Sequence, residues 1–262
     1  MDMAVQNHRS LERALDITEL ISANKKGLGL SEICTKLNLP KSSVFSLVHT
    51  LTVRNYLNID KYTGKYRLGL KIFEVGSKFL ENLDFYDEAK KIIQKMSNKC
   101  SETVHLAVLD KMDVVYIYKV DSTQAIRMSS SIGMHMPAHA TAIGKALLSR
   151  YTDKEIFNLY KDYPMVKITS NTITDINELT KQIKEIRKNG YAYEKEESTE
   201  KIECVAAPIH DANGKIFTAV SIAVPVFRVD DKKIEELIKL VKQGAEEIEK
   251  LACKGYIGNI GG

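Results

Sequence analysis

The sequence of 262 residues predicts an α+β protein in two parts, a small helical head and a larger body built on an antiparallel sheet. Apolar residues recur at helical spacing through residues 11–51. Two short alternating segments, residues 57–59 and 66–68, follow as a hairpin. Beyond residue 100 the pattern becomes three strands, helices, three strands and a closing helix, which is typical of an α+β domain.

The first helix is expected over residues 11–23, with Ser10 as its N-cap and Lys25-Lys26-Gly27 after its end. Its core-facing stripe is predicted to consist of Leu11, Leu15, Thr18 and Ile21.

A helix-turn-helix pattern follows. Ser31 can cap a helix that ends at Leu37, and Asn38-Leu39-Pro40 breaks it because proline cannot continue a hydrogen-bonded helix. Ser42 can cap a second helix. The apolar face of this second helix, with spacing i, i+3, i+4 and i+7, consists of Val44, Leu47, Val48 and Leu51.

The opposite face of the second helix carries small polar side chains, which suit insertion into the major groove of DNA. A generic helical hairpin with a solvated polar face is the alternative, and the following hairpin favours a winged helix-turn-helix because it lies where a wing belongs. The base-reading residues are predicted to be Ser42, Ser43, Phe45, Ser46 and His49. The phosphate-contacting residues are predicted to be Lys41, Arg54, Lys61, Lys65 and Arg67. This face has no arginine for guanine, which favours an operator core rich in A·T.

The net charge of +4 is unevenly distributed. Residues 1–80 hold 12 Lys and Arg against 7 Asp and Glu, whereas the remaining 182 residues hold 26 against 27. The positive excess therefore lies in the part with the helix-turn-helix pattern, as phosphate binding requires. The excess is modest, so two heads of one dimer are expected to bind together.

The composition is that of an ordinary soluble globular protein, with 44% hydrophobic and 27% charged residues. No apolar run approaches the ~18 residues of a transmembrane helix, and the N-terminus lacks the apolar core of a signal peptide. We therefore expect cytoplasmic localisation and no membrane partner. The four cysteines, Cys34, Cys100, Cys204 and Cys253, form no C-x-x-C pair and are expected to be reduced thiols.

We predict a winged head over residues 1–69, a linker helix over 70–83 and a body over 84–262. In the body, helices are expected over residues 85–99, 141–150, 153–159, 176–188 and 230–252. Strands are expected over residues 103–109, 114–120, 126–130, 191–194, 204–209 and 216–224.

Several motifs occur in order along most of the chain. In the head they include Gly29-Leu30-Ser31-Glu32-Ile33 and Leu39-Pro40-Lys41-Ser42-Ser43-Val44. In the body they include His139-Ala140-Thr141-Ala142-Ile143-Gly144-Lys145, Gly190-Tyr191-Ala192 and Cys204-Val205-Ala206-Ala207-Pro208-Ile209. These motifs resemble those of the IclR family of bacterial transcriptional regulators.

The resemblance implies a homodimer or homotetramer whose winged heads bind a near-palindromic double-stranded DNA operator. It implies a GAF-like C-terminal domain that binds a small organic acid, and repression is the expected sign of regulation. Phe45-Ser46 stands where the family often has His-Arg, a departure that bears on the operator sequence and not on the operator-binding role. Asn55 replaces a usual glycine, and asparagine tolerates the left-handed conformation.

The resemblance also implies an effector pocket lined by Met128, Ala142, Ile143, Glu194, Cys204 and Ser221. The amides of Ala142 and Ile143 lie in a first helical turn, which favours a carboxylate, and Gly144 is expected to allow close approach. Glu194 replaces the family's usual aspartate and Ala223 replaces a frequent serine. These two departures predict a ligand that differs from the smallest glyoxylate-like acids.

Other functions fit the sequence less well. A cysteine-dependent enzyme would need Cys204 as nucleophile with His210 or His105 as base, but Cys204 lies in an apolar strand. A redox sensor acting through Cys204 or Cys100 is a further alternative. Metal binding by His135 and His139 is disfavoured because Pro137 lies between them. We therefore expect no enzymatic activity, no cofactor and no metal.

Overall fold

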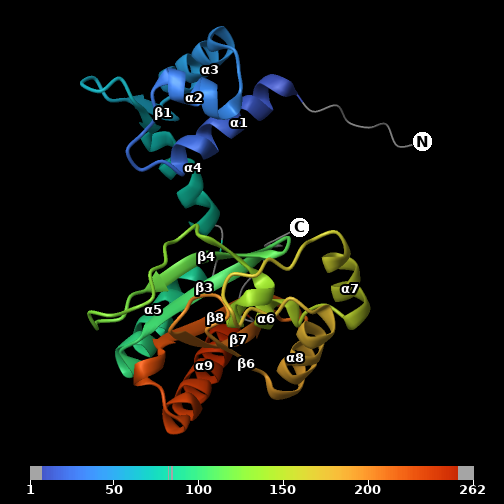
Figure 1. Cartoon of the computed structure of the whole chain (residues 1–262). Helices are drawn as coiled ribbons and strands as arrows, with labels where there is room; N and C mark the ends of the chain where they lie inside the picture. The colour runs from blue at the N-terminus through green and yellow to red at the C-terminus, as the bar shows by residue number, and fades with distance from the viewer. Residues whose placement is uncertain (1–7, 82, 84, 253–262) are drawn as a thin grey trace. The chain divides into compact units, whose positions relative to one another are not determined.

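The computed structural model describes residues 8–81, 83 and 85–252, and the chain divides into two compact units between residues 81 and 82 (Figure 1). Within this described part, no helix has the length and apolar character that crossing a membrane requires.

The first unit, the head, contains four helices and one hairpin within its described residues (Figure 1). In chain order these are α1 (Arg9–Ser22), α2 (Leu30–Leu37), α3 (Lys41–Val53), β1 (Leu57–Ile59), β2 (Tyr66–Leu68) and α4 (Leu70–Glu81). The strands β1 and β2 pair antiparallel, with Leu57 opposite Leu68 and Ile59 opposite Tyr66. Leu28 adds an isolated bridge to Tyr66. The predicted helix-turn-helix and wing are therefore confirmed.

The predicted N-caps Ser10, Ser31 and Ser42 are wrong, because each serine lies inside the first turn of its helix. The caps are the residues two positions earlier, namely His8, Gly29 and Pro40. At α2 the carboxylate of Glu32 accepts a hydrogen bond from the Gly29 N–H at 2.7 Å. This carboxylate satisfies an amide at the helix start that needs a partner, so a serine cap is unnecessary there.

The predicted stripe of α1 is also partly wrong. Ile17 and Ile21 are buried in the head core, but Leu11 and Leu15 are 60% and 54% exposed. The core of the head consists of Ile17, Ile21, Leu28, Ile33, Val44, Val48, Leu57 and Tyr66. The N-terminal half of α1 thus leaves its large apolar side chains uncovered in the single chain.

The turns of the head depend on two asparagines. Asn38 ends α2 with φ of 50° and Asn55 follows α3 with φ of 61°. Asparagine adopts this left-handed conformation more readily than other non-glycine residues. The prediction that Asn55 preserves the turn is therefore confirmed.

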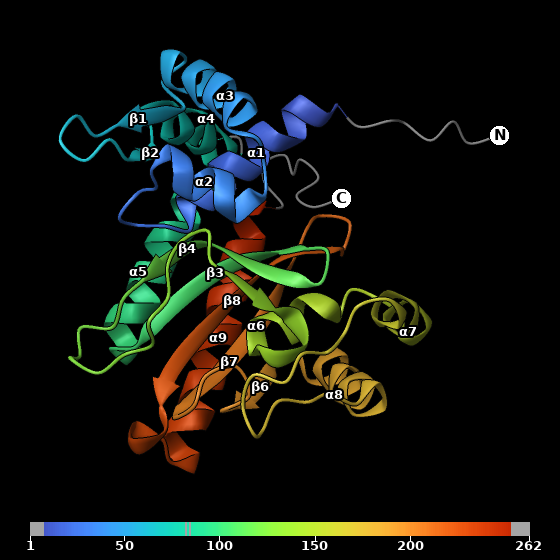
Figure 2. The same cartoon turned by 45° about the horizontal axis from the view of Figure 1, so that its top comes forward.

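The body carries six strands and its helices in the predicted general order (Figures 1 and 2). The strands are β3 (Thr103–Asp110), β4 (Asp113–Val120), β5 (His135–Pro137), β6 (Ala192–Lys195), β7 (Ile202–His210) and β8 (Ile216–Pro225). The helices are α5 (Tyr86–Cys100), α6 (Ala142–Leu148), α7 (Asp153–Lys161), α8 (Ile176–Asn189) and α9 (Asp231–Ala252).

The strands form one antiparallel sheet in the order β5-β4-β3-β8-β7-β6. Helices α5 and α9 pack on one face, and α6 packs on the other, where it also contacts α8 (Figure 2). The core on the α6 face includes side chains from α6, α7, α8 and five strands. This layer positions the candidate site of the body.

The strand predicted over residues 126–130 is wrong. The edge strand is instead β5, which pairs with the first residues of β4. Residues 126–130 are irregular, and the ammonium of Lys119 donates to the Ser130 carbonyl oxygen at 2.6 Å. A side chain of β4 therefore supplies a hydrogen bond that a strand pairing would have supplied.

A buried ion pair joins three parts of the α6 layer. The Lys145 side chain of α6 is fully buried, and its ammonium donates to both carboxylate oxygens of Glu197 at 2.6 Å. The same ammonium donates to Gln182 of α8 at 2.8 Å. Since Glu197 lies between β6 and β7, this pair ties α6 to α8 and to the β6–β7 connection.

Replacing Lys145 with alanine is expected to destabilise the body strongly, because it leaves the buried Glu197 carboxylate without its cation. The expected loss is about 3–5 kcal/mol, which lowers the melting temperature of the body by roughly 10 °C. Denaturant and thermal unfolding of the full chain measure this change. Lys95→Ala on the exposed face of α5 is the control. A loss below about 1 kcal/mol in Lys145→Ala would contradict the role of the pair.

Candidate functional site

The outer face of α3 is a small exposed surface over a buried core. Val44 and Val48 are fully buried on the inner face. The exposed residues on the outer face are Ser42, Phe45, Ser46 and His49. The Phe45 and His49 rings stack with centroids 6.2 Å apart. This surface therefore combines hydroxyl groups, an imidazole and an aromatic ring without a carboxylate.

Three further predicted residues lie at the edges of this face. Ser43 is half-buried, and the Arg13 guanidinium of α1 donates to its hydroxyl at 3.4 Å. Ser43 thus faces α1 rather than lying at the centre of the outer face. Lys41 and Arg54 are exposed at the first turn and the C-cap of α3.

The wing presents cations on an ordered turn. The Asp60 carboxylate accepts from the N–H groups of Tyr62 and Thr63, both at 3.0 Å, and these bonds lower the pKa of Asp60. The Lys65 ammonium lies 3.7 Å from the Glu32 carboxylate and the Arg67 guanidinium lies 3.6 Å from the Asp60 carboxylate, both in partly exposed pairs.

Lys61 is exposed at the wing and has no ion-pair partner within the described chain. The sequence reasoning missed Tyr62, which is fully exposed at the tip of the wing. The signal in the sequence was an aromatic residue within a polar turn. Such a ring is not buried in the core, so its presence points to a contact with a partner. Tyr62 is therefore a further candidate for contact with the sugar–phosphate backbone.

In the body, the six predicted effector residues are buried on the α6 side of the sheet. None of them is more than 8% exposed, and they are Met128, Ala142, Ile143, Glu194, Cys204 and Ser221. Glu194 is paired with Cys204 across β6 and β7. Ser221 is paired with Ala206 on one side and His105 on the other. Residues far apart in the chain are thus brought to one face.

Glu194 is the acidic group of this face. Its carboxyl group accepts from the Glu197 N–H at 2.8 Å and from the Ser198 hydroxyl at 3.0 Å. Burial raises the pKa of Glu194 to about 7, although both hydrogen bonds oppose the shift. Near neutral pH this side chain therefore exists partly as the uncharged acid.

A second polar cluster, which the sequence reasoning did not assign to the pocket, lies on the same face. His105 Nε2 is 2.8 Å from the Ser130 hydroxyl, and the His105 ring lies 4.6 Å from that of Tyr116. Burial, aided by the charge of Lys119, lowers the pKa of His105 to about 3. His105 is thus a neutral hydrogen-bonding group. A histidine inside an apolar strand was the available signal.

The first turn of α6 holds two free amides. Thr141 caps the helix, and its hydroxyl accepts from the Gly144 N–H at 3.0 Å. Within the described chain, the N–H groups of Ala142 and Ile143 donate no hydrogen bond. The expected role of Gly144 is wrong, because a Cβ there would lie 2.3 Å from the Ala138 carbonyl oxygen. Gly144 permits packing of α6, not approach of a ligand.

The competing residues have other roles. Burial raises the pKa of the Cys204 thiol, which keeps it protonated and unreactive. His139 Nε2 lies 3.1 Å from the Val166 carbonyl oxygen, and His135 lies 3.8 Å from Asp113. No group of three metal-binding side chains occurs among the described residues. Cys34, Cys100 and Cys204 are free thiols, whereas Cys253 lies outside the described range.

Comparison with known proteins gives one consistent result. A family model described as the bacterial transcriptional regulator IclR C-terminal domain matches residues 77–250, and the IclR helix-turn-helix domain matches residues 10–60. The transcriptional regulator KdgR of Escherichia coli is 30% identical over 249 residues, covering 94% of each chain. The acetate operon repressor of Salmonella typhimurium is 31% identical, covering 92% of this chain and 88% of that one. The crystal structure of Thermotoga maritima IclR matches with a TM-score of 0.76 at 33% identity, covering 92% and 98%.

The raised pKa of Glu194 predicts a pH-dependent stability. At pH values between 4.5, the ordinary pKa of glutamate, and about 7, the pKa of Glu194 in the folded state, the folded chain holds a proton that the unfolded chain releases. The stabilisation is complete below pH 4.5 and is lost as the pH rises through 7. The stability of the native chain relative to Glu194→Gln should therefore fall by about 2–3 kcal/mol from pH 5 to pH 8.

Urea unfolding at several pH values measures this difference, and Glu200→Gln at an exposed position is the control. A stability difference that does not change with pH would show that Glu194 is ionised throughout.

Proposed function

Because the chain belongs to the IclR family of bacterial transcriptional regulators, we propose that it is a repressor whose head binds an operator and whose body binds a small carboxylate. The protein is a DNA-binding regulator with an effector-binding C-terminal domain and is not an enzyme. The observation that carries the finer proposal is the pair of free amides at α6 beside a buried polar wall. That a relative is named a repressor supports the sign of regulation.

In the head, α3 enters the major groove and the wing contacts phosphates. Ser42, Phe45, Ser46 and His49 read base edges, with Ser43 at the margin of this face. Phe45 suits a thymine methyl group, and no arginine is present for guanine, so A·T pairs are favoured. The cations that contact phosphates are Lys41, Arg54, Lys61, Lys65 and Arg67.

In the body, the carboxylate accepts hydrogen bonds from the amides of Ala142 and Ile143. These amides donate to no group in the described part of the chain, and the helix dipole adds to their attraction for an anion. Met128, Cys204 and Ser221 surround the rest of the ligand, with Ser221 as the hydroxyl donor or acceptor. Glu194 in its uncharged form does not repel the anion.

A dimer is supported by uncovered apolar side chains in the head. On α4 no described residue is buried, and Leu70, Phe73, Val75 and Phe79 are between 50% and 70% exposed. Leu11 and Leu15 of α1 are exposed as well. Large apolar side chains left in water favour burial against a partner, and a second copy of the chain covers them while presenting two heads to one operator.

Replacing Lys61 with glutamine is expected to weaken binding to all DNA sequences about equally. Each phosphate contact contributes about 0.9 to the slope of log affinity against log salt, so a dimer should lose about two units. Fluorescence anisotropy with an operator fragment at several salt concentrations measures the slope. The control is Lys95→Gln in α5. An unchanged slope would show that Lys61 does not contact DNA. A loss of one unit would indicate that only one head of the dimer binds DNA.

Replacing Ser221 with alanine is expected to weaken effector binding by roughly ten- to a hundredfold, because a polar group of the ligand loses its partner. The ligand is selected first by a thermal-shift screen of α-keto acids, sugar acids and aromatic acids. Calorimetric titration then compares both chains. DNA binding without ligand should stay unchanged, which serves as the control for folding.

The same titration with and without operator DNA tests the switch, since coupling between two sites is reciprocal. If the acid binds free and DNA-bound protein with equal affinity, it is not the signal that releases DNA.

A further inference from the structure

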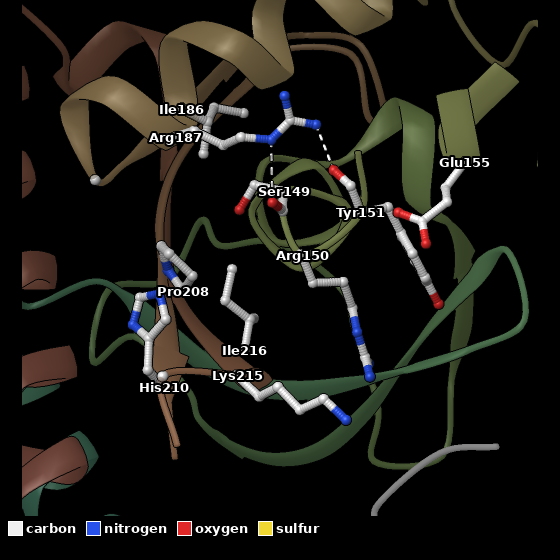
Figure 3. A pocket seen from close by; sticks show the side chains of 12 residues that line it. Ser149, Arg150, Tyr151, Glu155, Ile186, Arg187, Pro208, His210, Lys215 and Ile216 are labelled. Carbon is white, nitrogen blue, oxygen red and sulfur yellow. Dashed lines mark hydrogen bonds between the residues drawn. The ribbon is translucent and has the colours of Figure 1, made fainter. Parts of the chain in front are cut away.

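The body contains a hollow that is lined by none of the proposed effector residues (Figure 3). Its volume is about 520 Å³, which is in the range of small-molecule sites. It lies where the chain leaves α6, where α8 ends and where the hairpin between β7 and β8 turns. On β7, His210 of this pocket is six residues beyond Cys204 of the effector site, or about 20 Å along the strand. The two sites are therefore separate.

Two cations that line this pocket form no ion pair with any residue that the structure describes. Arg150 is half-buried, and its guanidinium lies over the Tyr151 ring, 5.4 Å from the ring centre. Lys215 is exposed, and its ammonium makes no ion pair within the described chain. In Figure 3 the long side chains of Arg150 and Lys215 point toward the same side of the pocket.

The other charged groups of the pocket are already engaged. Arg187 donates to the Ser149 carbonyl oxygen at 3.2 Å and to the Tyr151 carbonyl oxygen (Figure 3). It also donates to the Asp153 carboxylate at 2.7 Å. These bonds cover carbonyl groups at the end of α6, which would otherwise repel an anion.

Glu155 is the single carboxylate among the lining residues, and it accepts from the amide and hydroxyl of Thr152, each at 2.7 Å. His210 Nδ1 lies 2.6 Å from the Oε1 atom of Glu249, which fixes the imidazole ring. Arg150 and Lys215 remain the charges that a ligand would neutralise.

The remaining wall is apolar, with Ile186, Pro208 and Ile216. We propose that this pocket is a second ligand site that binds a small organic dianion, a phosphomonoester or a dicarboxylate. Arg150 and Lys215 contact its negative groups, and the apolar wall contacts its carbon skeleton. Charged donors around a partly apolar hollow are the usual composition of a metabolite site.

The test uses the full chain without DNA, titrated in a calorimeter with glycerol 3-phosphate and with succinate, and with glycerol as the uncharged probe. At least one dianion should bind, with an affinity that falls as salt rises, and glycerol should not. Comparison of the two dianions identifies the phosphate or the dicarboxylate as the preferred class. The double variant Arg150→Gln/Lys215→Gln should weaken binding at least tenfold. The charge-conserving Arg150→Lys/Lys215→Arg should retain most of it.

The matched control is Lys91→Gln/Lys95→Gln, which removes the same charge from α5 on the other face of the sheet. Equal weakening in this control would show attraction by overall charge and would overturn the site. Loss of binding in Ser221→Ala would place the dianion in the effector pocket and would overturn it as well. Absence of binding by both dianions has the same consequence.

Discussion

The buried pair of Lys145 and Glu197 is the interaction on which the layered body depends. A fully buried ammonium is costly unless its partner is fixed, and here two carboxylate oxygens and the Gln182 amide oxygen surround it. The same connection is held by Thr172, whose hydroxyl donates to the Glu197 carbonyl oxygen at 2.7 Å. Because the Glu197 N–H donates to Glu194, the pair also fixes the buried Glu194 carboxyl group, which belongs to the proposed effector site. The stability of the body and the geometry of the proposed site thus depend on one network.

Burial governs the charge of two polar groups on the α6 side of the sheet, Glu194 and His105. Burial shifts the pKa of Glu194 upward to about 7 and that of His105 downward to about 3, so near neutral pH His105 is uncharged and Glu194 is partly uncharged. A neutral acid and a neutral imidazole can donate or accept hydrogen bonds without a net field that opposes an anionic ligand. In the proposed binding mode the amides of α6 meet the charge of the ligand, and their partial positive charges do not titrate.

The head holds α3 on a small core and leaves the outer face of that helix exposed. Its small core holds α3 by Val44 and Val48, so the opposite side of that helix is free for DNA. The ordered turn at Asp60 presents cations on the wing without burying them. Because the core of the head is small, large apolar residues of α1 and α4 stay exposed. A second copy of the chain is the partner that we propose for them.

Local patterns were sufficient for most elements, because helical spacing, strand alternation and turn residues act over a few positions. These local patterns predicted the helix-turn-helix, the wing hairpin and the end of α8 at Gly190. The motifs along the chain indicated the family. The tertiary structure alone decided the N-caps His8, Gly29 and Pro40, and the edge strand β5 in place of residues 126–130. It also joined Lys145 to Glu197 and His105 to Ser130, 52 and 25 positions apart. Such contacts depend on the order in which the strands pair and on the packing of the helices against the sheet, and a pattern over a few neighbouring positions contains no information on either.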